Sequence, residues 1–181
     1  MLLEDRNAVV YGGGGAIGGA VALAFAREGA KVFLAGRTPA TLDRVAEEIF
    51  TVGGVAETAR VDALDELAVE KHIGEVVEQA GGIDVSFNAI SIKDVQLTPL
   101  VEMPREDFAS PIVAGTTTHL FTARAARRMA ERGSGVILTL LPRQSARTSR
   151  VSTWEASGSR ARRSRLSRNS SRWSLDHAAS A

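Results

Sequence analysis

Short apolar runs alternate with longer segments of helical periodicity along most of this chain. The runs are four to seven residues long and predict strands at Ala8–Tyr11, Lys31–Ala35, Val55–Val61, Ile83–Ala89 and Val136–Leu141. Because these runs are nearly all apolar, we expect both faces of the sheet that they form to be covered, as in a parallel sheet.

The segments between the strands predict helices at Ala20–Arg27, Pro39–Phe50, Ala63–Ala80 and Asp107–Arg132. In the third of these, the helical spacing places six apolar residues on the inward face: Leu64, Leu67, Ala68, Ile73, Val76 and Val77. In the long fourth helix we expect a bend near Pro111 and Gly115.

Strands that alternate with helices predict an α/β fold with right-handed crossovers. We therefore expect a Rossmann-like, doubly wound parallel sheet with strand order 3-2-1-4-5. In such a sheet the ligand crevice lies at the carboxyl ends of the first and fourth strands. Further strands that usually complete this fold would be missing, because the pattern ends after residue 142.

Residues 143–181 have a different composition from residues 1–142. Of these 39 residues, 20 are Arg or Ser, and no helical or strand period persists. They carry nine Arg and two acidic residues, a net charge of +7, whereas residues 1–142 carry −6. We expect one folded domain at 1–142 and a disordered, basic tail at 143–181.

The composition also excludes several classes of site. The sequence has no cysteine, so disulfides, thiolate zinc sites and cysteine nucleophiles are excluded. No apolar run reaches the length of about 20 residues that a membrane helix needs. The first residues lack the long apolar region of a signal peptide, so we expect a cytoplasmic protein without a membrane partner.

The glycine run Gly12–Gly19 lies between the first strand and the first helix. Glycines at such a turn let the backbone approach a diphosphate, and the free N–H groups of the helix's first turn point at it. Gly13, Gly15 and Gly18 satisfy G-x-G-x-x-G. Gly12, Ala16 and Gly18 fit the wider spacing G-x-x-x-G-x-G, with alanine at the middle position. The candidate residues for binding a dinucleotide here are Gly12, Gly14, Gly15, Ala16, Ile17 and Gly18. The alternative is a turn that serves only tight packing of the strand on the helix.

Four further positions lie where a dinucleotide would need them. Gly36 follows the second strand, where an NAD site would place an acidic residue, and Arg37 comes next. An arginine there can pair with a 2′-phosphate, which favours NADP over NAD; the alternative is a solvated loop arginine. Asp62 could accept a hydrogen bond from the adenine amino group, or cap the next helix. Asn88 and Ala89 could line the adenosine side of the cleft, unless Asn88 bonds only to neighbouring backbone.

With these residues the chain resembles the short-chain dehydrogenase/reductase family. The resemblance covers residues 5–142: the glycine loop, Gly36-Arg37, Val61-Asp62, the segment Ile83–Ala89, and the end of the long helix with the strand after it. It implies an NAD(P)-dependent oxidoreductase that acts on an alcohol or carbonyl group and is usually a homo-oligomer. The small-molecule substrate stays unknown.

The sequence departs from the family's pattern at its catalytic residues. Tyr11 is the only tyrosine, and the only lysines are Lys31, Lys71 and Lys93, so the Tyr-x-x-x-Lys pair is absent. That chemistry needs a proton donor beside the carbonyl. His119 could donate a proton in principle, but a helix-surface histidine is more often structural. We therefore assign no catalytic residue and no metal ligand. The alternatives are a dinucleotide-binding module without redox chemistry, and a protein that binds nucleic acid through its basic tail.

The composition of the tail also fits a shifted reading frame. With free codon choice, Trp154–Leu166 and Arg172–Ala181 can be back-translated so that another frame resembles the family's fifth helix and the entry to its sixth strand. We hypothesise that a frameshift near residues 143–153 replaced the original carboxyl-terminal part.

Overall fold

The computed structural model describes residues 1–90 and 98–140. The predicted tail and its frameshift lie outside these residues. Five strands form one parallel sheet in the order β3-β2-β1-β4-β5, as predicted. The strands are β1 (Asn7–Tyr11), β2 (Lys31–Gly36), β3 (Val55–Arg60), β4 (Val85–Asn88) and β5 (Val136–Thr139).

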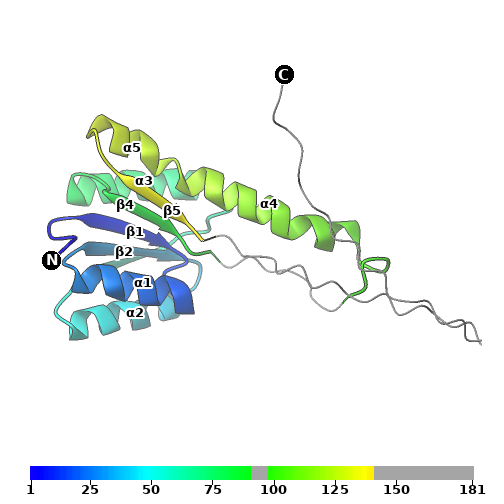
Figure 1. Cartoon of the computed structure of the whole chain (residues 1–181), viewed down its shortest axis with the longest axis horizontal. Coiled ribbons are helices and arrows are strands. Elements are labelled where there is room, and N and C mark those ends of the chain that lie inside the picture. The colour runs from blue at the N-terminus through cyan, green and yellow to red at the C-terminus, as the bar shows by residue number, and fades with distance from the viewer. Residues whose placement is uncertain (91–97, 141–181) are drawn as a thin grey trace, which may run out of the picture. The chain divides into compact units, whose positions relative to one another are not determined.

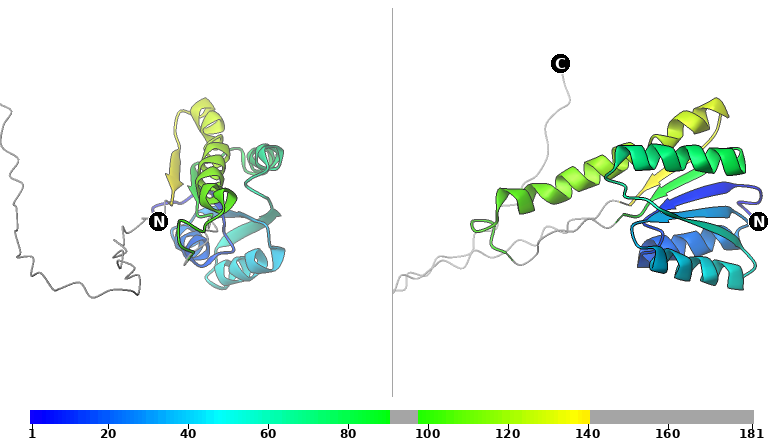
Figure 2. Two further views of the ribbon diagram at one scale, coloured as in Figure 1. Left: turned by 90° about the vertical axis from the view of Figure 1, so that its right-hand side faces the viewer. Right: turned by 180° about the vertical axis from the view of Figure 1, so that it is seen from behind.

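Helices cover both faces of the sheet, as Figures 1 and 2 show. On one face lie α1 (Ala16–Arg27) and α2 (Pro39–Thr51), and on the other lie α3 (Glu66–Ala80), α4 (Arg105–Thr122) and α5 (Ala125–Glu131). Two apolar cores follow from this layering. Val10, Leu34 and Phe87 belong to the core under α1 and α2, whereas Val9, Ile73 and Met129 belong to the core under α3 and α5.

The strands were predicted to within two residues wherever the structure describes their ends, but two helices begin at other places. The first helix starts at Ala16 instead of Ala20, because Gly15 serves as its N-cap and Gly18 and Gly19 are buried within its first turns. Glycine has a low helix propensity, which led to the later predicted start. Close packing of these glycines compensates for that propensity.

The third helix was also placed wrongly, at Ala63 instead of Glu66. Asp65 is its N-cap, since its carboxylate accepts hydrogen bonds from the N–H groups of Leu67 and Ala68. The prediction that Leu64 and Leu67 point inward is therefore wrong: their exposed fractions are 48% and 79%. Leu64 precedes the helix, and Leu67 lies off the buried face that Val69, Ile73 and Val76 define.

The long fourth helix is two helices, and the break lies at Ala123–Arg124 instead of near Pro111 or Gly115. Pro111 is accommodated inside α4. At the break, Arg124 N–H donates to Phe121 O and Ala126 N–H donates to Ala123 O, and these i→i−3 hydrogen bonds replace the α-helical pattern. Arg124 also pairs with Glu66 and Glu70 of α3, so the junction is tied to the neighbouring helix.

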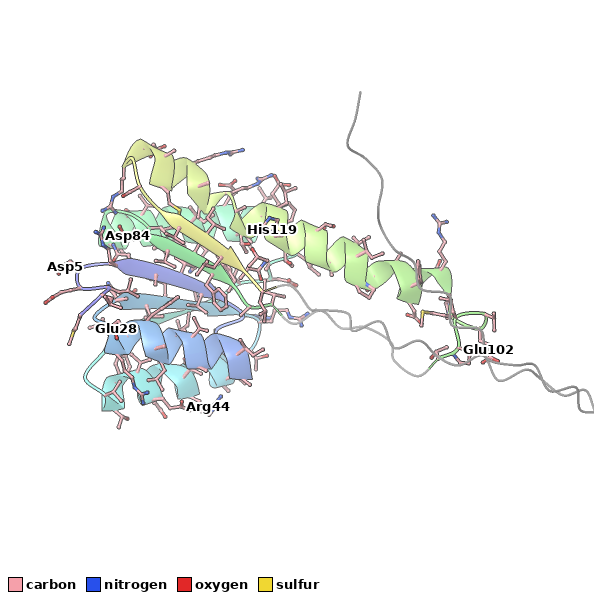
Figure 3. The ribbon with its side chains drawn as sticks, viewed as in Figure 1. Asp5, Glu28, Arg44, Asp84, Glu102 and His119 are labelled. Carbon is pink, nitrogen blue, oxygen red and sulfur yellow. The ribbon has the colours of Figure 1, made fainter. Side chains whose placement is uncertain are left out.

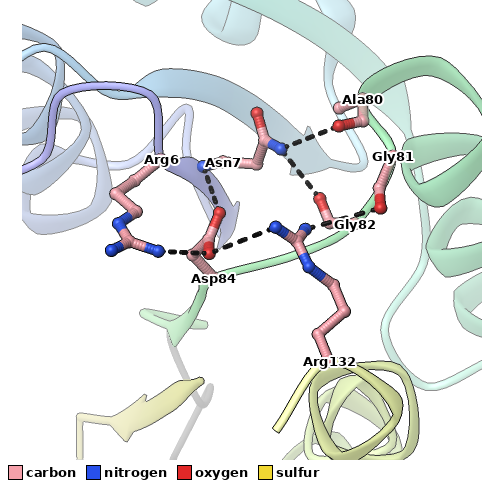
Figure 4. Close-up of polar contacts among 7 residues, drawn as sticks. All are labelled: Arg6, Asn7, Ala80, Gly81, Gly82, Asp84 and Arg132. Carbon is pink, nitrogen blue, oxygen red and sulfur yellow. Dashed lines mark hydrogen bonds and ion pairs between the residues drawn. The ribbon is translucent and has the colours of Figure 1, made fainter. Parts of the chain in front are cut away.

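The amino ends of the strands are held by a buried carboxylate (Figure 4). Asp84, before β4, accepts hydrogen bonds from Asn7 N–H at 2.9 Å and from the Arg6 guanidinium at 3.1 Å. Arg132, which follows α5, lies 3.9 Å from the same carboxylate. These contacts join β1, the approach to β4 and the end of α5 at the edge of the sheet opposite the glycine loop.

Candidate functional site

The glycine loop lies between the carboxyl end of β1 and the first turn of α1. Gly12 has φ +78°, a conformation that residues with a side chain rarely adopt, and a Cβ there would lie 2.7 Å from the carbonyl oxygen of Ala89. A Cβ at Gly18 would collide with the carbonyl oxygen of Gly12. The loop therefore packs against both β4 and its own helix, and this arrangement is possible only with glycine at both positions.

The first turn of α1 is open to a ligand that carries negative charge. Gly15 caps the helix without a side-chain hydrogen bond, and the first turn contains no acidic residue. The N–H groups that begin a helix have no partner within it, and the helix dipole is positive at this end. Apart from its chain neighbours, the only described atom within 4 Å of a Cβ built on Gly15 is the carbonyl oxygen of Gly12, at 3.3 Å, so this glycine borders open space among the described residues.

A cavity of about 400 Å³ lies beside the loop, at the carboxyl edge of the sheet. Its walls come from β1, β2, the segment after β3, the segment after β4, and α4. Six of the residues that the sequence nominated lie together in this wall: Gly12, Gly14, Gly15, Arg37, Asp62 and Ala89. Asp62 does not cap α3; its carboxylate accepts a hydrogen bond from the N–H of Leu64 at 3.0 Å.

The other four nominated residues do not line the cavity. Ala16, Ile17 and Gly18 lie in the first turn of α1, so backbone N–H groups are what they could offer a ligand. Asn88 is buried: its amide nitrogen lies 3.3 Å from Thr122 Oγ1, and its amide oxygen accepts from Ile90 N–H at 3.0 Å. Its side chain thus ties β4 to α4 and to the following backbone, which is the alternative role considered for it.

Sequence reasoning missed the part of the wall that α4 supplies. Ser110, Ala114 and Thr118 line the cavity and follow one another at intervals of four residues, so they form one stripe on the helix. This spacing of small residues was visible in the sequence, but the closeness of α4 to the glycine loop was not. Thr38 and Thr41, next to the start of α2, were missed as well; a Cβ at Gly14 would collide with Thr41 Oγ1.

Arg37 supplies the positive charge of the cavity wall. It is exposed, and within residues 1–90 and 98–140 its guanidinium forms no ion pair. Arg44 on α2, by contrast, pairs with Glu48 one helical turn away. The Arg37 guanidinium is therefore available to an anionic ligand.

The tyrosine and the histidine on α4 do not form a catalytic pair. Tyr11 is 1% exposed, and burial, reinforced by the charge of Glu70, holds the pKa of its hydroxyl well above the usual value. His119 lies near the carboxyl end of β5 (Figure 3), where its Nδ1 is 2.8 Å from Thr139 Oγ1. It is exposed and does not line the cavity. The structure therefore leaves the proton donor unassigned among the described residues.

No helix within residues 1–90 and 98–140 combines the length and the hydropathy that crossing a bilayer requires.

Comparison with known proteins places this geometry in a family. The family model described as enoyl-(acyl carrier protein) reductase matches residues 14–156, which extends past residue 142. The L-rhamnose 1-dehydrogenase (NAD(P)(+)) of Azotobacter vinelandii is 36% identical over 142 residues, which are 75% of this chain and 54% of that protein. The chain thus spans about half the length of the curated relatives that it matches.

Solved structures agree. An NAD+-bound xylitol dehydrogenase is 28% identical with a TM-score of 0.71, over 77% of this chain and 54% of that one. A metagenomic short-chain oxidoreductase in complex with NADP is 27% identical with a TM-score of 0.70, over 77% and 63%. The fold, the glycine loop and these matches together show that the chain belongs to the short-chain dehydrogenase/reductase family of oxidoreductases.

Proposed function

We propose that this chain binds NADP(H) in the cavity beside the glycine loop, as the cofactor-binding part of an oxidoreductase that acts on an alcohol or carbonyl group. The observation that carries the proposal is the junction of three features at one place. The glycine loop closes against Ala89, the first turn of α1 is uncapped by any side chain, and a cavity of about 400 Å³ adjoins both.

The residues around the cavity carry the chemical groups that a dinucleotide needs. A side chain at Gly15 would project into the space beside the loop, so this glycine keeps open a cradle for a diphosphate. The N–H groups at the start of α1 would then donate to phosphate oxygens. The carboxylate of Asp62 would accept from the adenine amino group on the wall formed after β3.

Arg37 supports NADP over NAD. A guanidinium forms strong, charge-assisted hydrogen bonds with phosphate, and no acidic side chain occupies the Gly36 position to bind a free 2′-hydroxyl instead. The names of the relatives point both ways: one structure holds NADP, another holds NAD+, and the rhamnose dehydrogenase carries both cofactors in its name. The preference of this chain for NADP over NAD is therefore decided by the binding test described below.

Carbonyl reduction requires a hydride, which the nicotinamide supplies when bound, and a proton, which the protein must deliver. The sequence contains no Tyr-x-x-x-Lys pair. Tyr11 is buried, and its raised pKa makes it a poor acid at neutral pH. The binding of the cofactor is thus the activity that the described residues support, and turnover is a separate outcome of the test.

The test is an equilibrium titration of the full chain with NADPH and with NADH, followed by nicotinamide fluorescence or calorimetry. We expect saturable binding of NADPH and weaker binding of NADH. The Arg37→Ala substitution should weaken NADPH binding about tenfold or more, the effect of one charge-assisted contact of about 1.5 kcal/mol, and leave NADH binding unchanged. Arg44→Ala is the matched control, because it removes an arginine outside the cavity.

Two results would change the proposal. Equal affinities for the two cofactors, unaffected by Arg37→Ala, would contradict the preference for NADP. Failure of the folded wild-type chain to bind either cofactor would contradict the proposal as a whole. Oxidation of NADPH in the presence of small ketones would identify a reductase with another proton donor, and its absence despite binding would identify a dinucleotide-binding module.

A further inference from the structure

Two buried polar side chains, Tyr11 and His72, meet between β1 and α3, and the proposed function uses neither of them. The exposed fractions of Tyr11 and His72 are 1% and 3%. The tyrosine hydroxyl oxygen lies 3.4 Å from Nδ1 of the imidazole, a long hydrogen bond. The two rings meet edge to face, with centroids 5.7 Å apart and planes at 78°.

Tyr11 stands at the junction of the sheet and the glycine loop. It is the last residue of β1 and one of the residues that line the cofactor cavity. Its carbonyl oxygen accepts from Ala89 N–H at 2.9 Å, and the next residue, Gly12, turns with φ +78° and donates its N–H to Ala35 O at 2.8 Å. A shift of the Tyr11 ring would therefore disturb the cavity wall and the start of the loop together.

His72 holds the far end of that ring. It comes from α3 and also lines a second cavity of about 320 Å³. The charged groups that face this second cavity are Glu57 from β3 and Glu75 and Glu78 from α3, while Glu70 acts on Tyr11. Because Tyr11 bridges the two cavities through His72, the position of α3 is linked to the shape of the cofactor site.

Burial keeps both partners of the hydrogen bond uncharged. Burial lowers the pKa of His72, against the opposing effect of Glu75, and burial raises the pKa of Tyr11. At neutral pH both side chains are then uncharged. A neutral imidazole and a hydroxyl can each donate or accept, so this hydrogen bond forms between two uncharged groups.

We propose that His72, acting through Tyr11, is a positioning residue of the cofactor cavity. It holds the tyrosine side chain in place and thereby fixes the residue that lines the cavity and precedes the glycine loop. The proposal rests on the proposed function, because its readout is the affinity for NADPH. It adds a residue more than 50 positions from the glycine loop that touches neither the cavity nor a ligand within it.

The test is a double-mutant cycle on NADPH affinity with the full chain at pH 7.5. Tyr11→Phe removes the hydroxyl, and His72→Leu removes its imidazole partner. Each should raise the dissociation constant about threefold to tenfold, and the double variant should raise it no further than either single one. His72→Gln keeps an acceptor oxygen of similar reach, and we expect it to restore affinity close to that of the wild type.

A control separates positioning from general loss of stability. Ser86 on β4 is equally buried and donates to Thr122 O at 3.3 Å, but it does not line the cavity. Ser86→Ala should lower the unfolding temperature without changing the dissociation constant for NADPH. If His72→Leu fails to fold, Tyr11→Phe and His72→Gln still decide the matter.

The outcomes are distinct. If the wild type binds NADPH and the Tyr11 and His72 variants bind it equally well, or if His72→Gln binds as poorly as His72→Leu, positioning by this hydrogen bond is overturned while the proposed function stands. If the folded wild type does not bind NADPH, both proposals are overturned. Additive effects in the cycle would also overturn the inference, because they would show that the two residues act separately.

Discussion

Apolar strands in the region from β1 to β3 and in the region from β4 to β5 differ in how far their side chains are buried. In β1 and β2 the interior residues are buried on both faces of the sheet. In β5, Val136 and Leu138 are 50% and 44% exposed, although their register partners on β4, Val85 and Phe87, are buried. Register partners in neighbouring strands share a face, and α1 and α2, which cover that face over the first region, do not cover it over β5.

The two regions also contribute differently to the core and to the cofactor cavity. The region from β1 to β3 shares one core with Val85 and Phe87 of β4, and it holds most of the nominated site residues, including the glycine loop, Arg37 and Asp62. The region after β4 supplies one wall of the cavity from α4 and an edge strand with apolar side chains on an open face. We infer that cofactor affinity depends mainly on the region from β1 to β3. The packing of β5 side chains contributes less to the stability of the protein than the packing of the side chains in the first region.

The largest expected effect comes from truncating both side chains of one register pair, Phe87 on β4 and Leu138 on β5. Phe87→Ala should lower the free energy of unfolding by about 3 kcal/mol, because Phe87 packs in the core and meets Phe25 edge to face. Leu138→Ala should lower it by about 1 kcal/mol or less, because this side chain is nearly half exposed. Urea unfolding at pH 7.5 measures both. Equal losses would contradict the open face over β5.

A second substitution tests the close approach of α1 to the loop. Gly18→Val should cost about 2 kcal/mol through overpacking, since the Cβ collides with the carbonyl oxygen of Gly12, and should weaken NADPH binding more than tenfold. The matched control is Gly74→Ala in α3, where a Cβ meets nothing within 4 Å. That change should stabilise the chain by about 0.5 to 1 kcal/mol and leave binding unaltered. Thermal unfolding and an NADPH titration measure the two effects in both variants. Unchanged NADPH binding by the Gly18→Val variant would contradict the proposal that the glycine loop binds the diphosphate.

The smallest expected effect concerns pH. Because burial lowers the pKa of His72 below the value of about 6.5 that it has in the unfolded chain, the unfolded state binds more protons as the pH falls. His72 should therefore leave stability unchanged above about pH 6.5 and reduce it below that pH. The difference in unfolding temperature between pH 7.5 and pH 5.5 should be larger for the wild type than for His72→Gln. An equal or smaller difference would show that the imidazole is not buried as described.

The sequence predicted the strands, their order and the place of the glycine loop, because hydrophobic period and glycine turns are local signals. The sequence did not predict the features that depend on specific side-chain hydrogen bonds. Asp65 caps α3, whereas the sequence offered only Asp62, as an alternative role. The choice between the cleft and neighbouring backbone stayed open for Asn88, which bonds to Thr122 and Ile90. The junction at Arg124 depends on two glutamates of another helix, which no local pattern could reveal. The wall from Ser110 to Thr118 likewise required the packing of α4 to be known.

Hydrogen exchange of the full chain with and without saturating NADPH tests most directly whether the glycine loop and the segments after β2 and β3 bind this cofactor. We expect slower exchange in peptides that cover residues 11–19, 36–41 and 61–64, and little change in peptides that cover β5. Unchanged exchange in the glycine-loop peptides at saturating NADPH, or protection confined to the region after β4, would contradict the account.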